Sequence, residues 1–218
     1  MIMRVLAIIP ARGGSKGIRR KNMVNFNGKP LIQWSIDAAN KSKYITDILV
    51  TSDDDEILEY ARKTNGVIDL KRPKELAKDN SRTEPVLVHA LKNIDKEYDY
   101  LILLQPTSPL RTTEDIDLAF QKLINSEGAS LISVCNIEVH PYKSFKVDKN
   151  GFLQGIINNE FPFYPRQKLP KVYKPNGAIY IIETAIFLKL EKLHTQRTIH
   201  YEMSKEKSLD VDVLTDLI

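Results

Sequence analysis

The segment from Arg12 to Asn22 concentrates the residue types that hold phosphate groups in proteins. It reads Arg-Gly-Gly-Ser-Lys-Gly-Ile-Arg-Arg-Lys-Asn and closely follows a short apolar run, Val5–Ile9. Glycines let the backbone turn its N–H groups toward an anion, while lysine and arginine neutralise the charge of that anion. The first 36 residues contain seven Lys or Arg and no Asp or Glu. The segment therefore predicts a polyphosphate-binding loop at the end of a buried strand.

The spacing of these glycines excludes two common phosphate-binding motifs. The Walker motif needs a longer gap between its glycines, and the dinucleotide motif needs a helix directly after them. Gly13 to Gly17 does match the nucleophile elbow of serine hydrolases, with Ser15 as the nucleophile. An elbow leads straight into an apolar helix, whereas basic residues follow Gly17. A serine hydrolase that uses Ser15 is kept as the alternative from another class of protein.

Asp210 and Asp212 form a second candidate site near the end of the sequence. One residue separates them, so in extended backbone both carboxylates point to the same side. Neighbouring carboxylates repel each other unless a cation lies between them, and Mg²⁺ prefers oxygen ligands combined with substrate phosphates. The pair therefore predicts a Mg²⁺ site. The alternative is that both acids simply cap a short terminal helix.

Gln105 opens a polar, proline-stiffened segment, Gln-Pro-Thr-Ser-Pro-Leu-Arg, that follows the apolar run Tyr100–Leu104. In open α/β sheets, ligands bind beyond the carboxyl ends of the strands. The amide of Gln105 can both donate and accept hydrogen bonds, which suits sugar hydroxyls. Gln105 is therefore a candidate sugar contact. The alternative, a capped turn before a helix, fits Thr112 and Thr113 better than it fits Gln105.

Alternating strands and helices must position these residues. Strands are expected over residues 5–9, 48–51, 67–70, 100–104, 130–135 and 178–182, and helices over residues 31–40, 57–63, 84–94, 112–125 and 185–193. Short apolar runs that alternate with helical patterns are typical of βαβ units. The order therefore predicts an α/β fold with a largely parallel sheet.

The pattern changes over residues 139–175. This segment holds five of the 11 prolines and seven of the 17 aromatic residues. Its apolar runs Phe145–Val147 and Phe152–Ile157 flank an Asn-Gly pair, which predicts a β-hairpin. A proline-rich, aromatic segment on a small domain cannot bury its own apolar groups, so we expect an inserted arm that packs on a second copy of the chain. The alternative is an ordinary surface excursion.

Composition and charge narrow the class of ligand. The net charge is +4, yet outside the first 36 residues 25 basic residues face 28 acidic ones, so the positive charge is local. This favours a small anionic ligand over nucleic acid. Cys135 is the single cysteine, which excludes an internal disulfide and indicates a reducing cytosol. Val5–Ile9 is too short for a secretion signal or a membrane span. We expect a cytoplasmic protein without a nucleic-acid or membrane partner.

Four segments in matching order resemble the acylneuraminate cytidylyltransferases, also called CMP-sialic acid synthetases, and related enzymes for legionaminic and other nonulosonic acids. They are Ile9–Gly17, Leu104–Arg111, Pro175–Tyr180 and Asp210–Asp212, and the resemblance spans essentially the whole chain. It implies a three-layer α/β/α Rossmann-like nucleotidyltransferase fold, with one domain over residues 1–218 and an inserted dimerisation arm over residues 139–175. The phosphatase or esterase domain appended in some relatives is not expected here.

The resemblance implies Mg²⁺-dependent transfer of CMP from CTP to an acidic nonulosonic sugar, with release of pyrophosphate. The alternative within the same class is a cytidylyltransferase for 3-deoxy-octulosonate or another sugar nucleotidyltransferase. The resemblance also implies a homodimer. The base that deprotonates the sugar hydroxyl, Asp212 or a metal-bound hydroxide, stays open.

The resemblance further implies roles for individual residues. The expected nucleotide contacts are Arg12, Ser15, Lys16, Lys21, Asn22, Arg72, Ser81 and Thr83. The expected acceptor-sugar contacts are Gln105, Lys143, Arg166, Asn176 and Tyr180, with the two cations reaching the sugar pocket of a neighbouring subunit. Asp210 and Asp212 would bind the metal. Arg12, Lys21 and Asp212 would take part in catalysis.

Overall fold

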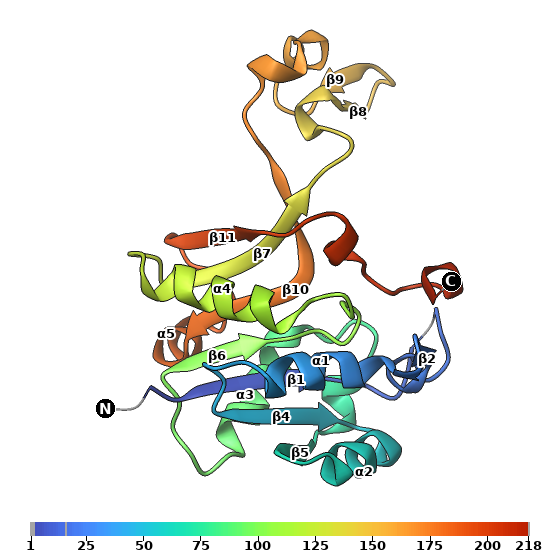
Figure 1. The fold of residues 1–218 in the computed structure, drawn as a ribbon. Helices are drawn as coiled ribbons and strands as arrows, with labels where there is room; N and C mark the ends of the chain where they lie inside the picture. Colours follow the sequence, from blue (N-terminus) through green and yellow to red (C-terminus); the bar gives the residue numbers. More distant parts are fainter. Residues whose placement is uncertain (1–2, 16, 218) are drawn as a thin grey trace.

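A mostly parallel sheet of seven strands organises the protein (Figure 1), as seen in a computed structural model that describes residues 3–15 and 17–217. The strand order is β11-β7-β10-β6-β1-β4-β5. The strands are β1 (Val5–Pro10), β4 (Asp47–Ser52), β5 (Val67–Lys71), β6 (Tyr100–Leu103), β7 (Ser130–Asn136), β10 (Tyr173–Glu183) and β11 (Thr198–Glu202). Only β10 runs antiparallel to its neighbours β6 and β7, among the described strands of this sheet. The predicted α/β fold is confirmed.

Helices cover both faces of the sheet, which gives three layers. They are α1 (Leu31–Asn40), α2 (Asp55–Lys63), α3 (Thr83–Lys92), α4 (Thr113–Ile124) and α5 (Thr184–Leu190). Buried side chains of α1, α2 and α4 share one core cluster, and those of α3 and α5 share another. Strand β1 contributes Ala7 and Ile9 to the first cluster and Leu6 and Ile8 to the second. Because successive side chains of a strand point to opposite faces, a strand buried on both sides must be apolar throughout.

Local sequence explains where the helices near the site begin. The side chain of Asp54 accepts hydrogen bonds from two backbone N–H groups at the start of α2. Thr112 and Asp115 form a reciprocal capping box at the start of α4. Both caps satisfy backbone donors that have no partner within the helix. The two caps therefore fix the direction in which α2 leaves the turn after β4 and α4 leaves the turn after β6.

The arm leaves the sheet between β7 and β10 and projects away from it (Figure 1). It contains the predicted hairpin, β8 (Phe145–Val147) with β9 (Leu153–Gly155), and three short 3-10 helices, η3 (Pro141–Lys143), η4 (Phe161–Phe163) and η5 (Arg166–Lys168). Its apolar side chains are poorly covered, since Phe152 is 68% and Phe163 78% exposed. That the arm packs on a second copy stays a prediction.

Two features were not predicted from the sequence. The edge strand β11 carries polar residues such as His200 and Glu202, so it has no apolar run. A two-residue hairpin, β2 (Asn25–Phe26) with β3 (Lys29–Pro30), turns at Asn27 and Gly28, both with positive φ. That Asn-Gly pair was an available hairpin indicator. Within the described ranges, no helix combines the length and the apolar character needed to cross a membrane.

Candidate active site

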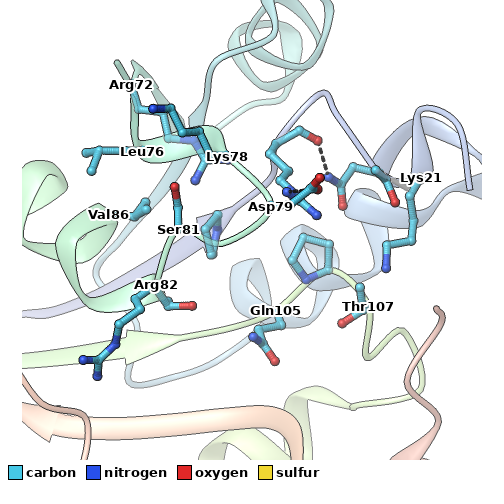
Figure 2. A pocket seen from close by; sticks show the side chains of 16 residues that line it. Lys21, Arg72, Leu76, Lys78, Asp79, Ser81, Arg82, Val86, Gln105 and Thr107 are labelled. Carbon is cyan, nitrogen blue, oxygen red and sulfur yellow. Dashed lines mark hydrogen bonds and ion pairs between the residues drawn. The ribbon is translucent and has the colours of Figure 1, made fainter. Parts of the chain in front are cut away.

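A cavity of about 250 Å³ opens at the carboxyl ends of β1 and β6. Its walls come from the loop after β1, the segment between β5 and α3, and the loop after β6 (Figure 2). It brings together eight residues predicted from the sequence: Arg12, Ser15, Lys21, Asn22, Arg72, Ser81, Thr83 and Gln105. The predicted contact Lys16 lies outside the described residues.

The loop after β1 is packed tightly against two other parts of the chain. The backbone N–H of Gly13 donates to Asp53 Oδ1 at 3.1 Å. A Cβ added at Gly13 would lie 2.4 Å from Asp54 Oδ2, and one at Gly17 would lie 2.3 Å from the carbonyl oxygen of Asp212. Glycine is therefore required at both positions by close approach. The loop is held between the start of α2 and the C-terminal segment.

Arg72 places a buried cation in the wall of this cavity. The residue is 5% exposed, and the nearest carboxylate, Asp53, lies 3.8 Å from its guanidinium. Its Nε has no hydrogen-bond partner in the described part of the chain. Burial lowers the pKa of Arg72, and Asp53 opposes this effect while Arg12 adds to it. A buried guanidinium with a free donor stabilises a ligand that supplies acceptor atoms.

The cavity is strongly basic and has one acidic side chain at its edge. Figure 2 shows Arg72, Lys78 and Ser81 on one side and Lys21 on the other. Arg12 Nη1 donates to Asp79 Oδ1 at 2.7 Å, which links the two walls. Lysine and arginine gathered around a small cavity favour a polyanionic ligand.

Asp210 and Asp212 lie on a segment that we call the C-terminal strap, residues 203–212. Between them, Val211 is fully buried and its N–H donates to the carbonyl oxygen of Thr107 at 2.8 Å. Lys21 Nζ donates to the carbonyl oxygen of Val211 and to Asp212 Oδ1, both at 2.9 Å. The strap therefore lies beside the cavity, joined to it by Lys21 and Thr107, which line it.

The two carboxylates influence each other electrostatically. Desolvation is the main reason why the pKa of Asp210 is raised, and the negative charge of Asp212 raises it further. The hydrogen bond from Thr107 and the positive charge of Lys21 lower it. Among the described residues, no group of three or more His, Cys, Asp or Glu could hold a metal ion. A cation at this pair would therefore need further oxygen ligands from substrate and water, as Mg²⁺ sites commonly have.

A larger open cavity of about 880 Å³ lies at the base of the arm. Asp210 lines it, together with Lys174 and Lys205. Thr107 lines the first cavity and hydrogen-bonds to Asp210. The hydrogen bond between Thr107 and Asp210 therefore makes the two cavities neighbours, an arrangement that suits two substrates that react with each other.

Asn176 and Tyr180 lie on β10, outside the linings of both cavities. Asn176 is buried, and its side chain bonds to Ser133, Ser208, Met203 Sδ and the N–H of Ala178. Its amide is thus occupied by the protein itself. Tyr180 is half-buried, and desolvation raises its pKa, with a smaller contribution from Asp210. A role for either residue in sugar binding stays a prediction.

Lys143 lies in η3 and Arg166 in η5 of the arm, and neither residue lines the cavity. Lys143 Nζ donates to the carbonyl oxygen of Tyr164 at 2.6 Å, and Arg166 donates to that of Glu138 at 3.2 Å. Both partners also belong to the arm or its base. Within one chain, the structure does not bring these cations to the other predicted site residues.

Several lining residues were missed by the sequence reasoning, above all Lys78, Asp79 and Arg82. They lie between η2 (Lys74–Ala77) and the start of α3, a segment that resembles an ordinary polar connection. Two indications were available: the segment contains the predicted contacts Ser81 and Thr83, and it follows a strand, where ligands of open α/β sheets bind.

The fold is that of α/β nucleotidyltransferases. The structure resembles that of CMP:2-keto-3-deoxy-manno-octonic acid synthetase complexed with CTP, with a TM-score of 0.71, covering 97% of this chain and 94% of that chain at 17% identity. At this identity the likeness shows the fold alone. It confirms the nucleotidyltransferase fold expected from the sequence.

The sequence profile of the cytidylyltransferase family matches residues 6–211, and the chain belongs to this family. It is 34% identical to an N-acylneuraminate cytidylyltransferase of Streptococcus agalactiae serotype V over 99% of this chain and 52% of that protein. It is 31% identical to a pseudaminic acid cytidylyltransferase of Campylobacter jejuni, over 99% and 94% of the two chains. A CMP-N,N'-diacetyllegionaminic acid synthase of Legionella pneumophila is 32% identical, over 98% and 93%. The chain spans about half the length of the streptococcal relative.

Proposed function

We propose that this protein transfers CMP from CTP to an acidic nonulosonic sugar of the N-acylneuraminate or legionaminate type and releases pyrophosphate. One observation carries the proposal: the basic cavity with the buried, incompletely paired Arg72 has a second cavity as its neighbour, joined to it by the hydrogen bond between Thr107 and Asp210. The names of the relatives support the reaction and the class of acceptor.

The first cavity suits CTP. Arg12, Ser15, Lys21 and Asn22 line the side formed by the loop after β1 and would hold the triphosphate. The opposite side, formed by Arg72, Ser81 and Thr83, would hold the cytosine base. Attack on the α-phosphorus develops charge on its oxygens and on the departing pyrophosphate. Fixed cations aimed at those atoms stabilise the transition state without a covalent protein intermediate.

Asp210 and Asp212 would hold Mg²⁺. Their donor set fits a hard divalent cation, because two carboxylates that repel each other lie beside a cavity suited to phosphate oxygens. When bound, Mg²⁺ would neutralise charge on the phosphate groups. Lys21 donates to Asp212 Oδ1 and so orients that carboxylate. Asp212 could accept the proton of the attacking hydroxyl.

The larger cavity would hold the sugar. Lys174 and Lys205 line it and could attract the carboxylate of the acceptor. Gln105 lines the first cavity and comes within 2.7 Å of the position that a Cβ on Gly177 would occupy, so it lies close to β10. This places an amide that can bond to hydroxyls on the side of the first cavity that faces β10.

A homodimer would complete the site, with the arm of one subunit supplying Lys143 and Arg166 to the other. The exposed Phe152, Leu153 and Phe163 support burial of the arm against a partner. The buried, unpaired thiol of Cys135 is compatible with a reducing cytoplasm. The homodimer and the cytoplasmic location were both expected from the sequence and are kept as proposals.

The test is pyrophosphate release from CTP and Mg²⁺ with a panel of acceptors. We expect turnover with N-acetylneuraminic, legionaminic or pseudaminic acid, and none with N-acetylglucosamine 1-phosphate. Turnover restricted to 3-deoxy-octulosonic acid would establish the alternative that the likeness to its synthetase favours. The serine hydrolase alternative is disfavoured, because no histidine is among the described residues that line the cavity beside Ser15. Ester hydrolysis abolished by Ser15→Ala, without nucleotidyl transfer, would overturn the proposal.

A further inference from the structure

The C-terminal strap carries both candidate metal ligands although it lacks the support of a strand or a long helix. It leaves β11 at Met203, whose N–H donates to Val134 of β7 at 2.8 Å, and next reaches another element through its backbone at Val211. Between these points the strap forms only the short 3-10 helix η6 (Glu206–Ser208). Side chains must therefore hold this stretch in place.

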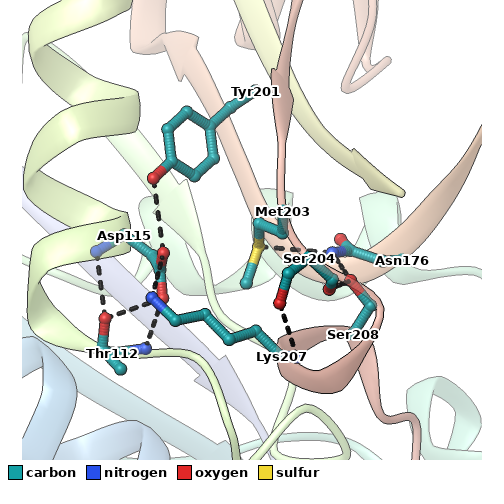
Figure 3. Close-up of polar contacts among 8 residues, drawn as sticks. All are labelled: Thr112, Asp115, Asn176, Tyr201, Met203, Ser204, Lys207 and Ser208. Carbon is teal, nitrogen blue, oxygen red and sulfur yellow. Dashed lines mark hydrogen bonds and ion pairs between the residues drawn. The ribbon is translucent and has the colours of Figure 1, made fainter. Parts of the chain in front are cut away.

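Lys207 is held by a buried partner (Figure 3). Its Nζ donates to Asp115 Oδ1 at 2.9 Å, and Asp115 is 3% exposed. The same carboxylate accepts from the hydroxyl of Tyr201 at 3.3 Å and from the N–H and hydroxyl of Thr112. Because Asp115 also caps α4, the ion pair ties the strap to the helix that follows the Gln105 segment. An ion pair with one fully satisfied, buried member has a defined geometry.

A second side-chain contact acts at the next residue. Asn176 Nδ2 donates to Ser208 Oγ at 2.9 Å, and Ser208 Oγ donates to the carbonyl oxygen of Ser204 at 2.7 Å. Asp210 follows two residues later. Contacts at Lys207 and Ser208 thus set the direction in which the strap approaches Asp210, although neither contact involves Asp210 or Asp212.

Lys205 offers an internal comparison. It lies two residues before Lys207 and pairs with Glu138, but both side chains are largely exposed. Such surface pairs contribute little to positioning, because solvent screens them and both side chains stay mobile. The strap therefore carries one exposed ion pair, at Lys205, and one with a buried carboxylate, at Lys207. The second lies nearer to Asp210 and Asp212 along the chain.

We propose that Lys207 is a positioning residue for the metal site, acting through Asp115 to hold the strap so that Asp210 and Asp212 face the phosphate groups. The inference rests on the proposed function, since it assumes a divalent cation at that pair. Groups that orient metal ligands typically affect metal affinity by about 10- to 100-fold. Lys207 acts through the backbone, so we expect an effect at the lower end of this range.

The test compares Lys207→Met with Lys205→Met in the full chain, using Mn²⁺ as a paramagnetic probe. Mn²⁺ affinity in the presence of CTP is measured by electron paramagnetic resonance, and CTP affinity without metal by calorimetry. We expect Lys207→Met to weaken Mn²⁺ binding roughly tenfold while metal-free CTP affinity stays within about twofold. Lys205→Met should match the wild type in both measurements, because neither contains the acceptor sugar whose proposed cavity Lys205 lines. If Lys207→Met does not fold, Lys207→Gln, which keeps a donor for Asp115, replaces it.

Unchanged Mn²⁺ affinity in the Lys207 variant would overturn the inference and leave the proposed function intact. An equal loss of metal-free CTP affinity would also overturn it, because it would indicate general damage. If wild-type protein with CTP binds Mn²⁺ no better than Asp210→Asn/Asp212→Asn, the metal site itself is wrong, and the inference falls with it.

Discussion

The nucleotide cavity and the arm both carry cations predicted to contact substrates, but the protein holds them in different ways. Arg72 is buried in the wall of the cavity, and Lys21 is bonded to the strap. Lys143 and Arg166 donate to carbonyl oxygens in an arm that exposes aromatic side chains such as Phe152 and Phe163. The cavity is organised by the fold of one chain, whereas the arm would acquire its environment from a partner.

The largest effect should come from Arg72→Met. Hydrogen bonds to a charged group contribute about 1.5–3 kcal/mol each, so if Arg72 donates two of them to CTP, its loss should lower kcat/KM for CTP roughly a hundredfold or more. The thermal unfolding temperature should rise, because a buried and incompletely paired charge is replaced by an apolar chain of similar length. Arg82→Met is the control, since Arg82 lines the same cavity but is exposed and paired with Glu84. Equal losses in both variants would contradict a special role for the buried cation.

The next effect concerns the arm. Phe152→Ser with Phe163→Ser should weaken self-association by about a hundredfold, if each of the four rings lost from a symmetric dimer contributes about 0.5–1 kcal/mol, as most interface residues do. Sedimentation at a series of concentrations measures this change. The unfolding temperature extrapolated to the monomer should not change, because neither ring packs in the core of the sheet. Unaltered association would show that the interface lies elsewhere.

A mixing experiment tests whether the arm acts in a neighbouring subunit. Arg12→Ala damages the cavity and Lys143→Met damages the arm, so each variant alone should be weakly active. After mixing and re-equilibration, a symmetric dimer should recover about a quarter of wild-type activity, because half of the dimers are hybrids with one intact site. Absence of recovery, with hybrids confirmed by differential tags, would place Lys143 in its own subunit's site or outside any site.

The smallest effect should come from Asp79→Asn. Arg12 bonds to Asp79, and both side chains are partly exposed. Such pairs are worth about 0.2–1 kcal/mol, so releasing Arg12 for phosphate should lower KM for CTP less than about fivefold. The change should shrink at high salt, which a titration of KM against ionic strength would reveal. A raised KM would mean that Asp79 supports CTP binding instead of competing with it.

Much of the fold could be predicted because apolar periodicity and turn residues indicate helices, strands and hairpins locally. Residues 31–40 were predicted as a helix and form α1 with those bounds. The hairpin β8–β9 followed from an Asn-Gly pair between apolar runs. The edge strand β11 was missed although Ile199 and Tyr201 alternate with polar residues and pack against the core, because an alternation over five residues is a weak indicator of a strand.

The sequence alone determined which residues could form the nucleotide site, because glycines, cations and paired carboxylates are recognisable by type and spacing. Tertiary structure decided how they are used. Burial makes Arg72 an incompletely paired cation, and the path of the C-terminal strap brings Asp210 of the larger cavity to Thr107 of the first. It also turns Asp115, a helix cap in the sequence, into the partner of Lys207 from 92 residues away. These properties depend on desolvation and on contacts between distant segments, and neither is encoded in any short stretch of residues.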